Sequence, residues 1–122
     1  MKYQITPMAK PRMTRADRWK QRPAVLKYRA YKDEIRLRQV SVPESGARII
    51  FVIPMPASWS KKKRQSMNGM PHRQRPDIDN LHKGLLDALF TEDCQVWDHW
   101  ITKVWGEEGA IIIEPISKRA AA

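Results

Sequence analysis

The sequence predicts an α+β fold: a mixed, largely antiparallel sheet of about four strands with two main helices. Short segments with strand-like patterns occur near both ends and in the middle of the chain. Two segments with helical periodicity lie between them. The 122 residues suit one domain and no linker divides them, so we expect residues 1–122 to fold as a single unit.

The first half of the chain predicts a strand, a helix and a second strand. Residues 2–6 alternate polar and apolar side chains, as a short strand does. Pro23 suits a first helical turn. Residues 24–39 follow as a helix, and the buried face predicted for it consists of Ala24, Tyr28, Tyr31 and Ile35. Residues 48–53 are a continuous β-branched and aromatic run, which indicates a buried central strand.

Residues 57–76 form a long basic connection with six bases and no acids. A connection of this length is usually functional or disordered, and Ser60 suits the cap of one helical turn within it. Together with the basic N-terminal stretch, it offers candidates for contact with DNA phosphates. These DNA-binding candidates are Lys10, Arg12 and Arg15, then Lys61, Lys62, Lys63 and Arg64, then Arg73 and Arg75.

The last part of the chain predicts a helix and a hairpin. The helix begins at Asp77 or Asp79 and ends at Phe90, and its apolar side should pack on the sheet. Residues 95–105 and 110–116 predict two strands. The short Gly-Glu-Glu-Gly segment between these strands predicts that they pair as a hairpin.

Charge and composition indicate the partner and the compartment. The net charge of +10 favours a polyanionic partner such as nucleic acid, and 42% hydrophobic residues with five Trp argue against a disordered basic tail. A single cysteine, Cys94, excludes an internal disulfide and a zinc cluster of thiolates. No apolar run approaches the ~20 residues of a membrane span, and the start lacks a signal peptide, so we expect a cytosolic protein without a membrane partner.

Asp77, Asp79 and Asp93 belong to an acidic segment in a basic chain. The 76 residues before Asp77 carry 19 Lys and Arg against 4 Asp and Glu, whereas the next 22 carry 6 acids and one base, Lys83. A divalent cation beside bound nucleic acid would account for this contrast. An Asp-x-Asp pair entering a helix can direct both carboxylates toward one ion, and Mg²⁺ prefers oxygen ligands. Helical spacing places Asp79 and Lys83 together on the exposed side.

Each of these residues also has a purely structural interpretation. Asp77 suits the N-cap of a helix, where a negative charge is favourable in any case. Asp79 and Lys83 suit a surface ion pair worth well under ~1 kcal/mol. Asp93 suits a solvated turn. On these interpretations the chain is a non-catalytic nucleic-acid-binding protein.

The motifs Asp77-Ile-Asp-Asn-Leu-His-Lys83, Asp87-Ala-Leu89 and Glu92-Asp-Cys-Gln-Val96 follow one another in this order. Their pattern resembles the signature of the RusA family of Holliday junction resolvases, and Pro54-Met-Pro56 is similar to phage and prophage members. The resemblance implies a Mg²⁺-dependent, homodimeric endodeoxyribonuclease of the bacterial cytosol. Such an enzyme cuts four-way junction DNA by paired symmetric nicks in DNA recombination and repair. A less selective nuclease for branched DNA is the alternative.

The resemblance, carried over by position, makes Asp77, Asp79 and Asp93 the metal-binding catalytic carboxylates. It makes Lys83 the essential lysine beside them, in contact with DNA. It implies one or two Mg²⁺ ions per site, with Mn²⁺ as a substitute. Glu92 stands where the family has Asp, so its own role is open.

Asp93 lies near the opposite end of the predicted helix from Asp77. The 11 residues from Asp79 to Phe90 span about 16 Å at 1.5 Å per residue. Asp93 therefore either folds back along the helix or joins the site of a second subunit, which two antiparallel helices about a twofold axis would allow. Leu86 lies with Phe90 on the otherwise polar side, and we expect a partner to cover both.

Overall fold

The computed structural model describes residues 1–12, 22–43, 45–90 and 96–116. Its elements follow the chain as β1 (Lys2–Tyr3), α1 (Pro23–Leu37), β2 (Ser45–Pro54), α2 (Lys61–Met67), α3 (Ile78–Leu89), β3 (Asp98–Gly106) and β4 (Ala110–Pro115). The four strands form one sheet in the order β1-β4-β2-β3. β2 pairs parallel with β3 and antiparallel with β4, and β4 pairs antiparallel with β1. The predicted α+β class with a mixed, largely antiparallel sheet is therefore confirmed.

The predicted hairpin between the last two strands is wrong. β3 and β4 follow each other in sequence, but β2 lies between them in the sheet. β2 is apolar along most of its length, and pairing on both sides satisfies its backbone where water is excluded. The short connection therefore passes around the end of β2, where the N–H of Met55 donates to the carbonyl of Gly106 (3.0 Å). A Cβ atom on Gly106 would collide with the side chain of Val52, so this tight passage requires glycine.

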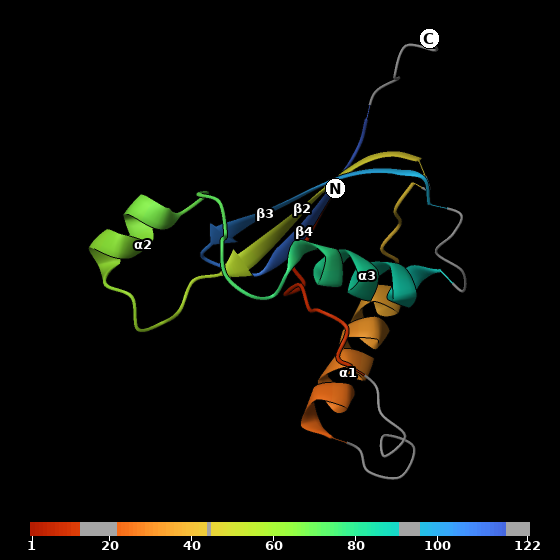
Figure 1. The fold of residues 1–122 in the computed structure, drawn as a ribbon, viewed down its shortest axis with the longest axis horizontal. Coiled ribbons are helices and arrows are strands. Elements are labelled where there is room, and N and C mark those ends of the chain that lie inside the picture. The colour runs from red at the N-terminus through yellow and green to blue at the C-terminus, as the bar shows by residue number, and fades with distance from the viewer. Residues whose placement is uncertain (13–21, 44, 91–95, 117–122) are drawn as a thin grey trace.

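α1 and α3 lie on the same side of the sheet (Figure 1). The core lies between these helices and the sheet. The core side chains that these helices contribute include Tyr28, Tyr31, Ile35, Leu81, Leu85 and Ala88. The sheet contributes the fully buried Ala47, Ile49, Phe51 and Ile111. The face predicted for the first helix needs one correction: Ala24 is exposed, and Val25 is buried instead. α1 already begins at Pro23, so Ala24 falls on the outer side of its first turn.

α2 stands apart from this two-layer body (Figure 1). It buries no side chain. A helix of seven residues replaces the single turn predicted there, and Ser60 caps it as expected, by accepting a hydrogen bond from the N–H of Lys63 (3.2 Å). None of the helices in the described parts of the chain is long and apolar enough to cross a membrane.

Candidate active site and nucleic-acid interface

Asp77 is the residue at which α3 begins, and its backbone has the extended conformation of an N-cap (φ −68°, ψ 149°). Its carbonyl accepts the first helical hydrogen bond, from the N–H of Leu81 (3.1 Å). The Asp77 side chain, however, makes no capping hydrogen bond and is exposed. Asp77 therefore occupies the N-cap position through its backbone conformation only. Its carboxylate takes no part in capping and is available for a ligand.

Asp79 and Lys83 lie one turn apart on the exposed side of α3. The surface ion pair considered for them is not formed, and neither residue has an ion-pair partner among the described residues. Asp79 stands in the first turn, where the partial positive charge of a helix end favours an anion. Together with Asp77, they present two unengaged carboxylates and an ammonium at one exposed end of a helix.

The N-terminal segment brings two predicted DNA-binding residues to α3. The backbone of Met8 lies against Gly84, where a Cβ atom would come within 2.6 Å of the Met8 carbonyl oxygen. Two residues later, Lys10 forms an ion pair with Asp87 (2.7 Å). A recess beside the helix is lined by Lys10, Pro11, Arg12, Asn80 and Lys83. Two basic residues that are distant in sequence thus lie beside Lys83, and one of them, Lys10, is paired with Asp87.

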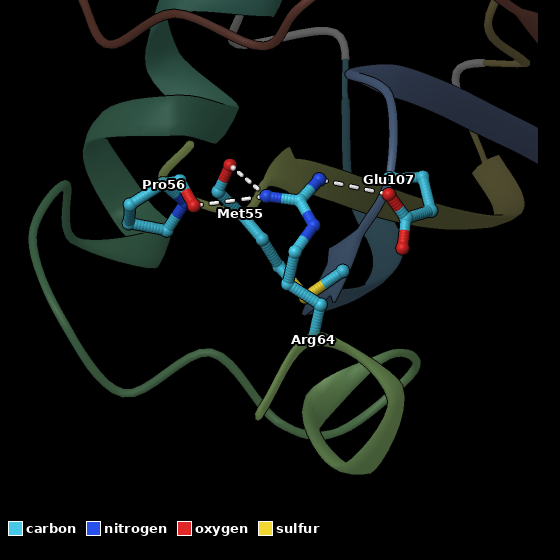
Figure 2. A network of polar contacts seen from close by, with 4 residues as sticks. All are labelled: Met55, Pro56, Arg64 and Glu107. Atoms are coloured by element: carbon cyan, nitrogen blue, oxygen red, sulfur yellow. Dashed lines mark hydrogen bonds and ion pairs between the residues drawn. The ribbon is translucent and has the colours of Figure 1, made fainter. Parts of the chain in front are cut away.

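The bases of α2 divide into an exposed group and an anchor. The exposed bases are Lys61, Lys62 and Lys63. Figure 2 shows that the Arg64 guanidinium instead donates to the carbonyls of Pro56 (2.9 Å) and Met55 (3.5 Å) and to the carboxylate of Glu107 (2.8 Å). Arg64 therefore ties α2 to the body of the protein, and its contact with DNA stays a prediction. Arg73 and Arg75 are exposed just before α3.

An aromatic cluster supports the two ends of the connection that carries α2. The ring centroids of Trp59 and Trp105 lie 4.8 Å apart, and those of His72 and Trp105 lie 4.3 Å apart. Burial lowers the pKa of His72, and the positive charge of Lys103 lowers it further. His72 is therefore a neutral, packed side chain at pH 7.

Some of the predicted site lies outside the described residues, namely Arg15, Glu92 and Asp93. The neighbouring structure shows where the segment 91–95 is attached. His82 of α3 lies beside His99 of β3 (Nε2 to Nδ1, 3.0 Å), while Lys103, farther along β3, contacts the segment before Asp77. α3 therefore runs antiparallel to β3, and its last turn before Phe90 lies toward the start of that strand, away from Asp77.

Leu86 is buried within one protomer (5% exposed), so the prediction that a partner covers it is wrong. α3 packs against both α1 and β3. Side chains are therefore buried over a larger part of its circumference than in a helix that packs on one element alone. Phe90 is half-buried, and its contact with a partner stays a prediction.

A comparison with protein families shows the class of this protein. A family model described as Endodeoxyribonuclease RusA matches residues 2–114 of the 122. The chain belongs to the RusA family. RusA proteins are endodeoxyribonucleases that resolve Holliday junctions, so the chain is a crossover junction endodeoxyribonuclease. No curated protein and no solved structure was found to match it.

One residue beside the candidate site of this RusA-family protein, Lys103, was missed in the sequence. Its ammonium donates to the carbonyl oxygens of Gln74 (2.6 Å) and Pro76 (2.8 Å), in the segment that leads into α3. A signal was present, because strand alternation places Lys103 on the same side as Ile101 and Trp105. A lone charge between two apolar side chains on one face of a strand indicates a specific polar partner.

Proposed function

We propose that this RusA-family protein is a Mg²⁺-dependent Holliday junction resolvase that acts as a homodimer. It cuts four-way junction DNA by paired symmetric nicks, in DNA recombination and repair in the bacterial cytosol. The observation that carries this proposal is the exposed pair Asp77 and Asp79 at the start of α3, which lacks capping and ion-pair partners among the described residues. Unengaged carboxylates in a chain of net charge +10 suit a cation that works beside a polyanion.

The donor set fits Mg²⁺ or Mn²⁺. Asp77 and Asp79 offer carboxylate oxygens, and Mg²⁺ usually takes one or two protein carboxylates while it keeps several waters. The described residues contain no group of three or more His, Cys, Asp or Glu placed to hold a metal. The third ligand is assigned to Asp93, which lies outside them. One or two bound ions would supply an activated water and neutralise charge on the phosphate.

Lys83 is proposed to act on the scissile phosphate. Hydrolysis joins a water oxygen to phosphorus, breaks the bond from phosphorus to the leaving sugar oxygen, and transfers a proton to that leaving oxygen. Negative charge grows on the phosphate oxygens during this step, and the Lys83 ammonium, one turn from Asp79, stabilises it. Lys10 and Arg12 line the same recess and hold neighbouring phosphates.

The remaining bases are proposed to orient the arms of the junction. Contacts to phosphates position DNA without reading its sequence. The residues assigned to this task are Arg15, Arg73 and Arg75, together with Lys61, Lys62, Lys63 and Arg64. A basic helix that projects from the body (Figure 1), together with a separate basic recess on α3, suits a substrate whose duplex arms diverge.

Two matched nicks require two active sites, which favours a homodimer. Asp93 follows Phe90 by three residues, and an extended chain covers at most about 11 Å over that length. The 12 residues of α3 span about 18 Å, so Asp93 suits the site of a partner subunit better than its own. Trp97, just before the edge strand β3, and Trp100, within it, are exposed and offer an apolar surface for contact with a second copy.

A synthetic four-way junction and a linear duplex of matched sequence test this proposal, each with Mg²⁺ and with EDTA. We expect paired nicks in the junction with Mg²⁺, no nicks with EDTA, and little cutting of the duplex. Equal cutting of both substrates would favour the less selective nuclease. Junction binding without cutting, at any Mg²⁺ or Mn²⁺ concentration, would overturn the proposal.

A further inference from the structure

We infer that Lys103 is a positioning residue for the carboxylates that begin α3. Its ammonium holds residues 74–76 in place, and this segment leads directly into Asp77. The inference rests on the proposed function, because that function assigns Asp77 and Asp79 to a metal ion. Lys103 acts through the backbone of its neighbours and is not itself a ligand.

Lys103 occupies a place in the sheet that ordinarily holds an apolar residue. Its register partner on β2 is Phe51, which is fully buried, and Phe51 pairs on its other side with Ile111 of β4. Paired residues of neighbouring strands share one face of a sheet, so the Lys103 side chain starts on the face that the helices cover. An ammonium left without a partner there would lose hydration free energy. The side chain therefore has to end on polar atoms.

Two backbone carbonyls supply those atoms. Lys103 Nζ donates to the carbonyl oxygen of Gln74 (2.6 Å) and to that of Pro76 (2.8 Å). The Lys103 backbone adds a further bond, because its carbonyl accepts the N–H of His72 (3.1 Å). Among the described residues, these are the hydrogen bonds that join residues 72–76 to the sheet. Lys103 thus supplies all of these hydrogen bonds, while the His72 ring also packs on Trp105 of the same strand.

The backbone of Asp77 is held from two sides. On the helical side, its carbonyl accepts the N–H of Leu81 (3.1 Å). On the other side, the preceding carbonyl, that of Pro76, is bound by the Lys103 ammonium. Mg²⁺ requires near-ideal ligand geometry, so its affinity depends on how firmly both carboxylates are placed. Loss of the Lys103 ammonium frees one side of Asp77 and should weaken metal binding at the Asp77–Asp79 pair.

The variant Lys103→Met tests this role, because methionine keeps an unbranched apolar side chain and removes the ammonium. Lys27→Met, on the exposed side of α1, is the matched control. Mn²⁺ binding to the DNA-free protein is measured by titration calorimetry. We expect Lys103→Met to bind Mn²⁺ about 10-fold or more weakly than wild type, the scale seen when a residue that orients a metal ligand is lost. Wild-type protein and Lys27→Met should bind equally.

A second readout separates positioning from a general loss of structure. Junction binding in EDTA should be unchanged in Lys103→Met, and a higher Mn²⁺ concentration should restore its cutting rate. Equal Mn²⁺ affinities of Lys103→Met and wild type would overturn this inference alone. If circular dichroism shows that Lys103→Met does not fold, Lys103→Gln replaces it, because glutamine is neutral and too short to bind both carbonyls; weaker Mn²⁺ binding supports the role and equal binding overturns it. A wild-type protein that binds no Mn²⁺ would overturn the proposed function as well.

Discussion

The backbone of Met8 lies so close to Gly84 of α3 that a Cβ atom on Gly84 would stand 2.6 Å from the Met8 carbonyl oxygen. The same Cβ atom would lie 3.0 Å from the amide nitrogen of Lys10. The Gly84 carbonyl in turn accepts a hydrogen bond from the buried hydroxyl of Tyr28 (2.8 Å). Gly84 thus contacts both the N-terminal segment and α1. Its missing side chain allows Lys10 and Arg12 to lie beside Asn80 and Lys83 of α3.

The substitution Gly84→Ala should displace the N-terminal segment. Alanine favours a helix by about 1 kcal/mol over glycine. Forcing a methyl group against packed backbone costs about 1–3 kcal/mol, so we expect a net loss of stability in urea unfolding. Junction binding should also weaken, because Lys10 and Arg12 move with the segment. Unchanged unfolding and unchanged junction affinity in Gly84→Ala would contradict the close contact.

The stability of the protein should depend on pH through His72. Its folded-state pKa lies below the ordinary value of 6.5, so below that pH the unfolded chain binds a proton that the folded chain does not. Stability is therefore fully present above pH 6.5 and is lost as the pH falls toward the lowered pKa. Urea unfolding at pH 7.5 and 5.5 should show a smaller loss for His72→Phe than for wild type. Equal losses in the two proteins would contradict this assignment.

The anchoring of α2 predicts a difference between Arg64→Ala and Glu107→Gln. Arg64→Ala removes the bonds to Met55, Pro56 and Glu107, whereas Glu107→Gln removes only a partly exposed ion pair worth about 1 kcal/mol or less. We expect Arg64→Ala to weaken junction binding more, because the lysines of α2 lose their fixed position. Fluorescence anisotropy with a labelled junction measures both variants. Equal effects would mean that Arg64 acts through its charge alone.

A mixture of two inactive variants tests whether Asp93 crosses the dimer. If each site draws Asp77 from one subunit and Asp93 from the other, a heterodimer of Asp77→Asn and Asp93→Asn has one intact site and one doubly altered site. Such a mixture should regain single-strand nicking of the junction, although each variant alone is inactive. If both residues of a site come from one chain, the mixture stays inactive. Gel analysis of nicked products after subunit exchange decides between the two arrangements.

Local sequence patterns predicted the features that depend on local chemistry. The apolar spacing of α1 and α3, the apolar run of β2 and the start of α3 at Asp77 all depend on neighbours in the chain. The hairpin prediction failed because the strand that lies between β3 and β4 comes from far upstream. Leu86 was misplaced because α3 meets two surfaces, α1 and β3.

The partners of Lys103 could not be predicted for a different reason, although its place between two apolar residues of a strand signals that it needs polar partners. Its partners are the backbone carbonyls of Gln74 and Pro76, which every residue type carries, so no side chain in the sequence marks the contact. The recess on α3 was equally hidden, because Lys10 and Lys83 meet only through the packing of the N-terminal segment on Gly84.

The central claim is that Asp77 and Asp79 hold the ion with which the protein cuts DNA. Junction cutting by Asp77→Asn, with Asp33→Asn on the exposed side of α1 as the control, tests it most directly. The Asp77 side chain makes no capping bond, so its substitution should leave stability nearly unchanged. We expect Mg²⁺-dependent cutting to fall by about 100-fold or more, while binding in EDTA stays equal or becomes tighter. If Asp77→Asn cuts the junction as fast as wild type, the claim that Asp77 holds the ion is wrong.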